Sequence, residues 1–182
     1  MKYFSSTAPE VQNFSKILVE EHGLEKKGFD QTRYVFLAHS SEDKKTLPFA
    51  IGFIEKFGIK VYIDKEDKEL PQKTSSETGA KLKDRIAQCS KFVILVTANS
   101  KNSRWIPWEL GIADEKKKIR NVALMPDVEN QSNGEWSEQE YLGLYPRIVQ
   151  GRHASYVNPI WMVYDHHTNT GTELGEWLNQ GN

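Results

Sequence analysis

Residues 102–118 hold the most chemically suggestive cluster of the chain, in which Trp105, Pro107 and Trp108 stand just before Glu109. A carboxylate beside aromatic rings suits a ligand site, because rings can stack on a flat ligand and the acid can stabilise developing positive charge. Helix-start chemistry explains the same residues: proline fits the first helical position, and an acid nearby complements the helix dipole, which also favours its ionised form. Taken singly, Pro107 and Glu109 favour the helix start and the two tryptophans favour packing, and only the coincidence of these residues suggests a site.

A second polar group follows an apolar run and contains Ser40, Ser41 and Asp43. Hydroxyls and free backbone N–H groups at a helix start can hold a phosphate. Serine and aspartate are also the commonest helix caps, so capping explains the same residues. The segment has neither the G-x-G-x-x-G fingerprint of dinucleotide-binding folds nor the lysine of a P-loop.

Two other patterns suggest different classes of protein but lack the partners that those classes need. A response-regulator receiver requires a phospho-acceptor aspartate at the end of the third strand, where this chain has Thr97. The run Tyr-Asp-His-His at residues 164–167 is similar to a metal-phosphoesterase motif, but such sites need further aspartates at earlier strand ends. A polar loop with Asp165 or Thr168 as a cap explains this run, and no metal site is predicted.

The elements that must position these residues alternate along the chain. Short apolar runs predict five strands, at residues 33–40, 59–64, 91–97, 121–128 and 159–165. Amphipathic stretches predict helices at residues 5–23, 47–58, 80–90, from about 107 onward, within 137–149 and at 171–181. The polar stretch 65–79 is expected to be a long loop. This alternation predicts an α/β, flavodoxin-like three-layer fold, with a five-stranded parallel sheet of order 2-1-3-4-5 and helices on both faces.

The predicted strand order also says where a ligand would bind. In open parallel sheets, ligands bind beyond the carboxyl ends of the strands, where the winding direction reverses. For the order 2-1-3-4-5 this point lies between the first and third strands. The two loops that follow those strands are residues 38–45 and 98–109, so Ser40, Ser41 and Glu109 all belong to the expected site.

The composition limits which cellular compartment and which partners are expected. The chain has 182 residues, a net charge of −1 and a single cysteine, Cys89, which fits a reducing compartment and excludes an internal disulfide. Nothing in the charge balance suggests nucleic acid or an anionic membrane as a partner, and the longest apolar run, residues 92–96, is too short to span a bilayer. The start of the chain lacks the apolar region of a signal peptide. We therefore expect a soluble cytoplasmic domain at residues 31–182, with residues 1–30 as a helical extension packed on it.

Three segments resemble a known family: "YVFLAHSSEDK", "VYID" with the polar loop up to Gly79, and "CSKFVILVTANSKNSRWIPWELGIA". They look like the three signature regions of a TIR (Toll/interleukin-1 receptor) domain, and the resemblance extends from about Arg33 to the C-terminus. In NAD-consuming members, the segment after the third strand carries the catalytic glutamate, and its pattern matches here as Ser103, Trp105 and Glu109. The run "QEYLGLYP" looks like stand-alone bacterial TIR proteins, including those of Thoeris-like antiphage systems.

The resemblance adds candidate residues to those already named. It implies that the loop 65–79 is a lid, with Glu77 and Gly79 on its ligand side, beside the substrate-binding candidates Trp105, Ser40 and Ser41. This sequence departs from the family pattern at two places, and each departure weakens the assignment of a candidate residue. The loop is longer and richer in serine, threonine and lysine than the usual version, and the two serines stand where some relatives carry arginines, so phosphate contacts there would be weaker.

The activity implied is cleavage of NAD⁺ at the nicotinamide–ribose bond, as an NAD⁺ nucleosidase or ADP-ribosyl cyclase. Nicotinamide leaves as a neutral molecule, so the general acid of ordinary glycosidases is unnecessary and one carboxylate, Glu109, can stabilise the ribosyl cation. Capture by water gives ADP-ribose, and capture within the same molecule gives a cyclic isomer. NAD⁺ is then the substrate, and no cofactor is expected.

The resemblance also implies partners. Self-association with other TIR domains on activation is expected, as is a separate effector that senses the product in antiphage signalling. The alternative functions are a non-catalytic TIR module that works by assembling with other TIR domains, and a secreted virulence TIR protein. An intact Glu109 favours the enzyme, because a scaffold has no need of it.

Overall fold

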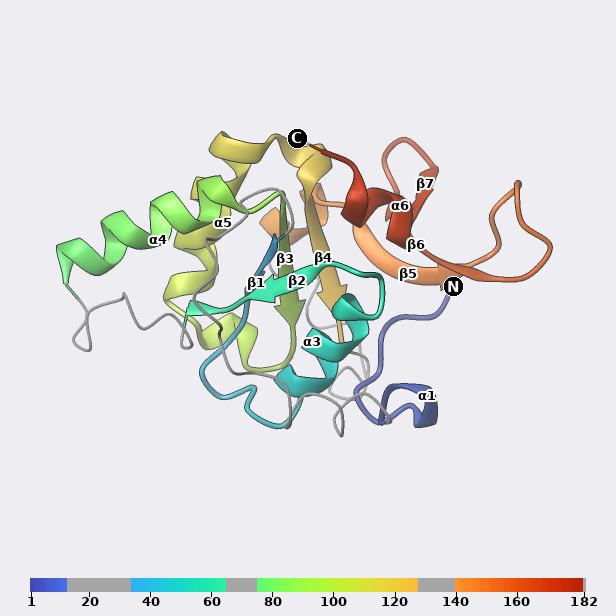
Figure 1. Cartoon of the computed structure of the whole chain (residues 1–182), viewed down its shortest axis with the longest axis horizontal. Helices are drawn as coiled ribbons and strands as arrows, with labels where there is room; N and C mark the ends of the chain where they lie inside the picture. The colour runs from blue at the N-terminus through green and yellow to red at the C-terminus, as the bar shows by residue number, and fades with distance from the viewer. Residues whose placement is uncertain (13–33, 65–74, 128–139, 182) are drawn as a thin grey trace.

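The computed structural model describes residues 1–12, 34–64, 75–127 and 140–181, which form an α/β fold around one twisted sheet (Figure 1). Seven strands of this described part are hydrogen-bonded in the order β2-β1-β3-β4-β5-β6-β7. Their bounds are β1 Tyr34–Ala38, β2 Lys60–Tyr62, β3 Lys91–Val96, β4 Val122–Pro126, β5 Arg147–Gly151, β6 Ile160–Asp165 and β7 Thr170–Glu173.

The sheet is mixed, which corrects the prediction of five parallel strands. Strands β1 to β5 are parallel in the predicted order 2-1-3-4-5, but β5 and β6 are antiparallel, as are β6 and β7. The predicted fifth strand, residues 159–165, is β6, and β5 lies in the segment that was expected to be a short helix. The sequence signal of β5 is weak because only Ile148 and Val149 form an apolar run, and its pairing with β4 and β6 decides its conformation.

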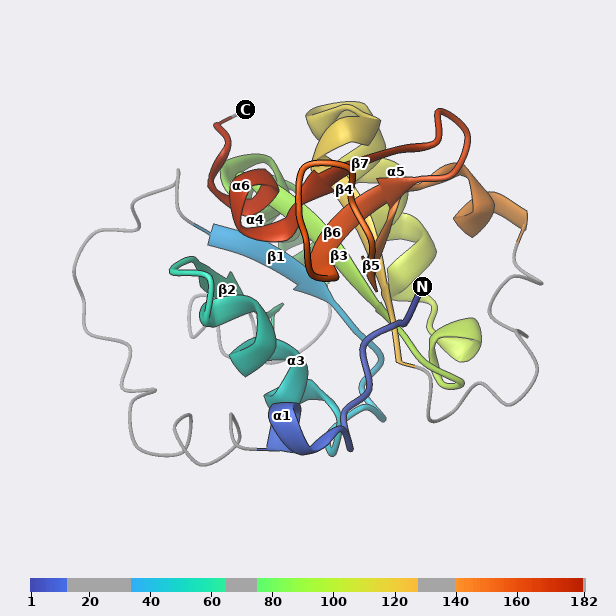
Figure 2. The same cartoon turned by 90° about the vertical axis from the view of Figure 1, so that its right-hand side faces the viewer.

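Helices cover both faces of the sheet, as predicted (Figures 1 and 2). Their bounds are α1 Pro9–Gln12, α3 Leu47–Glu55, α4 Ser76–Gln88, α5 Trp105–Lys117 and α6 Leu174–Asn179, with 3₁₀ turns η3 Ser100–Asn102, η4 Ile119–Asn121 and η7 Glu140–Leu144. Helix α4 begins four residues before the predicted position, so the end of the expected loop 65–79 is helical. Residues 65–74, and most of the helix predicted at 5–23, lie outside the described residues.

Alternation along the strands produces two apolar cores. In β1, Val35 and Leu37 pack toward α3 and α6, whereas Phe36 and Ala38 pack toward α4 and α5. Every residue of β3 is buried, as expected for a central strand covered on both faces. The carboxyl ends of β1 and β3 are thereby fixed beside the start of α5.

The first described residues belong to the body of the domain. The backbone of Lys2 exchanges two hydrogen bonds with Gln150 of β5, and Phe4 is fully buried, with its ring 5.2 Å from that of Phe53. Further along, the Ser6 hydroxyl donates to the Asp127 carboxylate at 2.9 Å. This segment completes the core on the α3 face. Among the described residues, no helix has the length and apolarity needed to cross a membrane.

Candidate active site

The turn before α5 differs in detail from the sequence interpretation. Helix α5 begins at Trp105, and the Ser103 hydroxyl accepts a hydrogen bond from the backbone N–H of Ile106 at 3.3 Å. Pro107 is therefore the third helical residue and not the first, and Glu109 lies beyond the first turn. The prediction failed by two residues because Ser103, and not the residue before proline, supplies the first-turn hydrogen bond.

Glu109 is buried, with 4% of its surface exposed, and no hydrogen bond to its carboxyl group is found among the described residues. Burial, and secondly the negative charge of Asp64, raise the pKa of Glu109 to about 8. The expectation that the helix dipole keeps this acid ionised is therefore wrong. The dipole acts within the first turn, whereas desolvation acts on the whole buried side chain.

Asp64 is a further candidate site residue, which the sequence did not reveal. It follows directly after Ile63, at the carboxyl end of β2, and its side chain is half-buried. The available signal was its position, because the carboxyl ends of parallel strands share one edge of the sheet. Two carboxylic acids from separate elements, Asp64 and Glu109, therefore interact at that edge.

The two tryptophans form an exposed aromatic pair on α5. Trp105 and Trp108 each have 38% of their surface exposed, and their rings meet edge to face with centroids 5.4 Å apart. A Cβ atom at Gly79 of α4 would lie 3.8 Å from the Trp108 ring, so α4 packs closely against this tryptophan. Trp108 was interpreted as a packing residue, but it packs with one part of its ring and exposes another.

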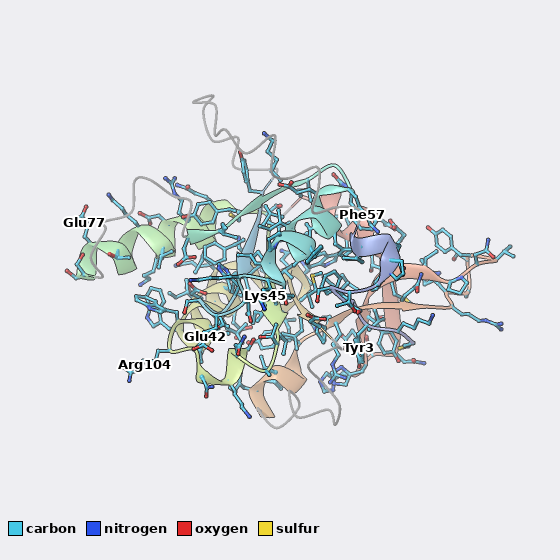
Figure 3. All side chains as sticks on the ribbon, turned by 90° about the horizontal axis from the view of Figure 1, so that it is seen from below. Tyr3, Glu42, Lys45, Phe57, Glu77 and Arg104 are labelled. Atoms are coloured by element: carbon cyan, nitrogen blue, oxygen red, sulfur yellow. The ribbon has the colours of Figure 1, made fainter. Side chains whose placement is uncertain are left out.

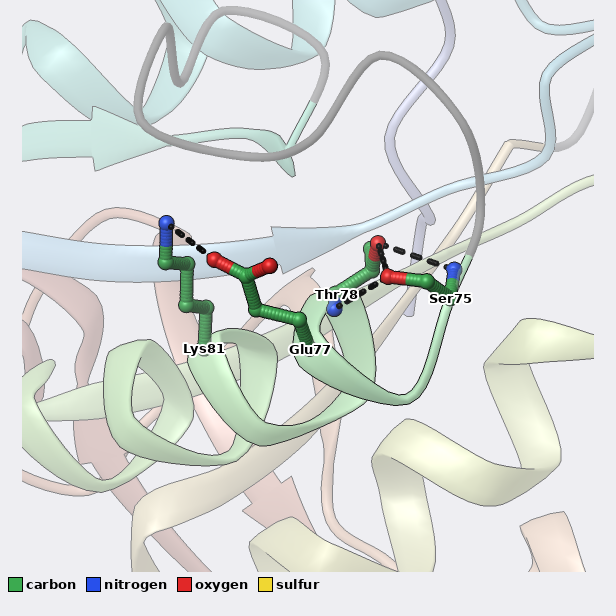
Figure 4. A network of polar contacts seen from close by, with 4 residues as sticks. All are labelled: Ser75, Glu77, Thr78 and Lys81. Atoms are coloured by element: carbon green, nitrogen blue, oxygen red, sulfur yellow. Dashed lines mark hydrogen bonds and ion pairs between the residues drawn. The ribbon is translucent and has the colours of Figure 1, made fainter.

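The first turn of α4 separates the two residues that were expected on the ligand side of the loop. Ser75 caps the helix in a reciprocal arrangement with Thr78, and Glu77 forms an ion pair with Lys81 at 3.2 Å with its side chain 66% exposed (Figure 4). Figure 3 shows Glu77 at the outer tip of α4, well away from Arg104 at the start of α5. The structure thus brings Gly79 beside the tryptophan pair and leaves Glu77 in solvent.

The polar groups of the loop after β1 form most of their hydrogen bonds within that loop. Ser40 is buried, and its hydroxyl accepts from the backbone N–H of Glu42 at 3.3 Å, whereas Ser41 is exposed. The proposed capping role is not observed, because Thr46 occupies the N-cap position of α3 and no side chain caps that helix. Contact of Ser40 or Ser41 with a ligand stays a prediction.

Asp43 connects this loop to the one that follows β3. Its carboxylate accepts hydrogen bonds from the Thr97 hydroxyl and the Asn99 side-chain amide, both at 2.8 Å. The two loops that were expected to border a ligand site therefore meet through direct hydrogen bonds.

Other candidate groups have structural roles. Burial raises the pKa of Cys89 to about 12, so its thiol is not a nucleophile. Asp165 accepts from the backbone N–H of His167 at 2.8 Å in the turn between the antiparallel strands β6 and β7, so it holds a strand-to-strand turn and does not cap a helix as expected. Within the described ranges, no three His, Cys, Asp or Glu side chains are placed to hold a metal ion.

Comparison with known proteins identifies the family. The family model for the TIR domain matches residues 35–146, and the chain belongs to the TIR domain family. It is 36% identical over 129 residues to the probable 3′ cyclic ADP-D-ribose synthase ThsB′ of Bacillus cereus (strain MSX-D12), covering 69% of this chain and 66% of the relative. It is 31% identical over 103 residues to the putative cyclic ADP-D-ribose synthase TIR2 of Cytobacillus dafuensis, covering 54% of this chain and 27% of the relative.

These matches confirm the resemblance to bacterial TIR proteins of the Thoeris type. The chain spans just under two thirds of the first relative and about a quarter of the second. The matched region contains β1 through η7, and therefore both loops at the carboxyl edge and all of α5.

Proposed function

We propose that this TIR protein cleaves NAD⁺ at the nicotinamide–ribose bond, releases nicotinamide and forms a cyclic ADP-ribose isomer or ADP-ribose. The observation that carries the proposal is Glu109, a buried carboxyl group without a hydrogen-bond partner among the described residues, at the carboxyl edge of the sheet. The names of two relatives, both cyclic ADP-D-ribose synthases, support the same reaction.

The environment of Glu109 suits a reaction in which positive charge develops. Its pKa of about 8 results from burial and from Asp64, and a bound cation would relieve both effects by favouring the ionised form. NAD⁺ brings such a cation in its nicotinamide ring. As the glycosidic bond breaks, charge moves from that ring to the ribose, and the carboxylate of Glu109 stabilises it there in a low-dielectric setting.

The exposed tryptophans supply a binding surface for flat rings. Trp105 lies one helical turn before Glu109, so a ring stacked on Trp105 would lie close to the acid, and the Trp108 ring meets that of Trp105 edge to face. Stacking on such aromatic faces contributes roughly 1–3 kcal/mol per base. The outcome of the reaction then depends on water: exclusion of water favours internal capture of the ribosyl cation and a cyclic product.

The test is cleavage of NAD⁺ by the purified full chain and by Glu109→Gln, with nicotinamide release and products followed by chromatography and mass spectrometry. We expect Glu109→Gln to lose at least about 100-fold in turnover, the scale for removing one electrostatic stabiliser. Glu115→Gln is the matched control, because Glu115 lies on the same helix but is exposed beside Lys116. Its turnover should equal that of the wild type.

Two outcomes would overturn the proposal. Turnover that survives Glu109→Gln would remove this residue from the mechanism. A wild-type chain that releases no nicotinamide, even when clustered through a fused oligomerisation tag, would leave a TIR module that acts only by assembling with other TIR domains. We infer an antiphage signalling role in the cytoplasm, with a separate effector that senses the product, from the resemblance to TIR proteins of the Thoeris type. Phage challenge of cells with and without Glu109→Gln tests this role.

A further inference from the structure

The buried carboxylate of Asp43 is the strongest unexplained polar feature near the site. Only 3% of the residue is exposed, yet three donors converge on it: the Ser40 backbone N–H at 3.0 Å, the Thr97 hydroxyl at 2.8 Å and the Asn99 amide at 2.8 Å. One donor comes from its own loop after β1, and two come from the loop after β3. The carboxylate therefore joins two loops more than fifty residues apart in the sequence.

A continuous set of hydrogen bonds extends from this carboxylate toward α5. The Thr97 hydroxyl that donates to Asp43 also accepts from the backbone N–H of Asn99 at 3.1 Å. The Thr97 backbone N–H donates to the Ser100 hydroxyl at 2.9 Å, and that hydroxyl donates to the Leu95 carbonyl at 3.0 Å. The loop is thus fixed to β3 on one side and to Asp43 on the other.

The fixed loop leads without interruption into the helix that carries Glu109. The 3₁₀ turn η3 begins at Ser100, and Ser103 follows it and bonds to the first turn of α5. No flexible linker separates the Asp43 contacts from Trp105, the first residue of α5. A shift of this loop would therefore be transmitted to the first turn of α5.

The domain contains a matched buried aspartate with a different connection. Asp127 is fully buried at the carboxyl end of β4, and its carboxylate accepts from the Ser6 backbone N–H at 3.3 Å and the Ser6 hydroxyl at 2.9 Å. It therefore holds the N-terminal segment and not the loop before α5. Comparing the two aspartates separates the general effect of losing a buried carboxylate from an effect on the site.

We propose that Asp43 is a positioning residue that sets the location of Glu109 by holding the loop between β3 and α5. The catalytic part of this inference rests on the proposed function, because it concerns turnover at Glu109. Asp43 itself touches no reacting atom. Misplacement of a catalytic group by about 1 Å can cost on the order of 100-fold in rate, so a loop of this kind needs rigid support.

The first test follows hydrogen exchange in the purified full chain by mass spectrometry and needs no activity. Asp43→Asn replaces one accepting oxygen by an amide that cannot accept, so peptides covering residues 97–109 should exchange at least about tenfold faster. Asp127→Asn should speed exchange in residues 2–8 and leave residues 97–109 unchanged. Unchanged exchange of residues 97–109 in Asp43→Asn would overturn the proposal.

The second test measures NAD⁺ turnover in the same variants. Asp43→Asn should lower kcat at least about tenfold, whereas Asp127→Asn should stay within about twofold of the wild type. Thr97→Val, which removes the donor to Asp43, should behave as Asp43→Asn does, and Thr97→Ser, which keeps the hydroxyl, should retain activity. If Asp43→Asn fails to fold, the two threonine variants still test whether the contact between Asp43 and Thr97 is needed for turnover.

Equal losses in Asp43→Asn and Asp127→Asn, or in Thr97→Ser and Thr97→Val, would show a merely structural role and overturn the positioning role. A wild-type chain without turnover would instead overturn the proposed function, and the exchange experiment would still decide whether Asp43 holds the loop.

Discussion

Two buried acids lie at the carboxyl edge of the same sheet, and their surroundings are opposite. Asp43 receives three hydrogen bonds, whereas Glu109 receives none from the described residues. A buried carboxylate with several donors is a stable structural group, and one without donors has a raised pKa and is available for a ligand. The difference teaches that the acid with several donors is held in the framework at this edge, whereas the acid without donors has the environment that the proposed NAD⁺ cleavage requires.

The largest expected effect that tests this contrast is the pH dependence of NAD⁺ cleavage. Because the free protein holds Glu109 at a pKa of about 8 and the mechanism needs its ionised form, kcat/KM should rise about fiftyfold between pH 6 and pH 8 and level off above. Asp64→Asn should move the midpoint to lower pH, because it removes one cause of the raised pKa. A profile that is flat from pH 6 to pH 9 would contradict the assignment.

The next effect is on the free energy of unfolding, which substitutions of the two acids should change in opposite directions. Glu109 binds a proton more tightly in the folded chain than in the unfolded one, so its contribution to stability falls as pH rises from about 4.5 to about 8. Glu109→Gln, which stays neutral, should therefore exceed the wild type by a few kcal/mol at pH 9 and match it near pH 4. Chemical denaturation at both pH values measures this.

Asp43→Asn should instead lose about 1–3 kcal/mol of stability at neutral pH, because a buried donor is left without an acceptor. If Glu109→Gln proved as destabilising as Asp43→Asn at pH 9, the distinction between the structural acid and the functional acid would fail.

The smallest effect on NAD⁺ turnover is expected at the amino edge of the sheet, where the buried ionisable side chain is a lysine. Lys91 is almost completely buried and donates to the Asn121 side chain at 2.6 Å, and burial lowers its pKa to about 8. The unfolded chain binds this proton more tightly, so the contribution of Lys91 to stability should rise by about 2–3 kcal/mol between pH 8 and pH 10.5. Lys91→Met should lack this rise while NAD⁺ turnover stays within about twofold. A loss of turnover would show that the amino edge also contributes to the site.

Strong local patterns were sufficient for most of the fold. The runs that became β1, β3 and β4 are continuous apolar segments, and their burial on both faces follows from the pattern alone. Strand β5 has a weaker pattern, and only its neighbours β4 and β6 decide its conformation. The antiparallel direction of β6 depends on the same pairing, because a strand's direction is not written in its hydrophobicity.

For the candidate site too, some properties follow from the sequence and others only from the fold. The sequence by itself determined the identity of Glu109 and Trp105, their spacing on one helix and their place after the third strand, because these are local properties of the chain. Only the tertiary structure decided that Glu109 is desolvated, that Asp64, two residues after β2, interacts with it, and that Gly79 packs against Trp108. It also decided that Asp43 joins the two loops instead of capping a helix. Desolvation, charge coupling and cross-loop hydrogen bonds depend on distances between residues far apart in the chain, and folding alone sets those distances.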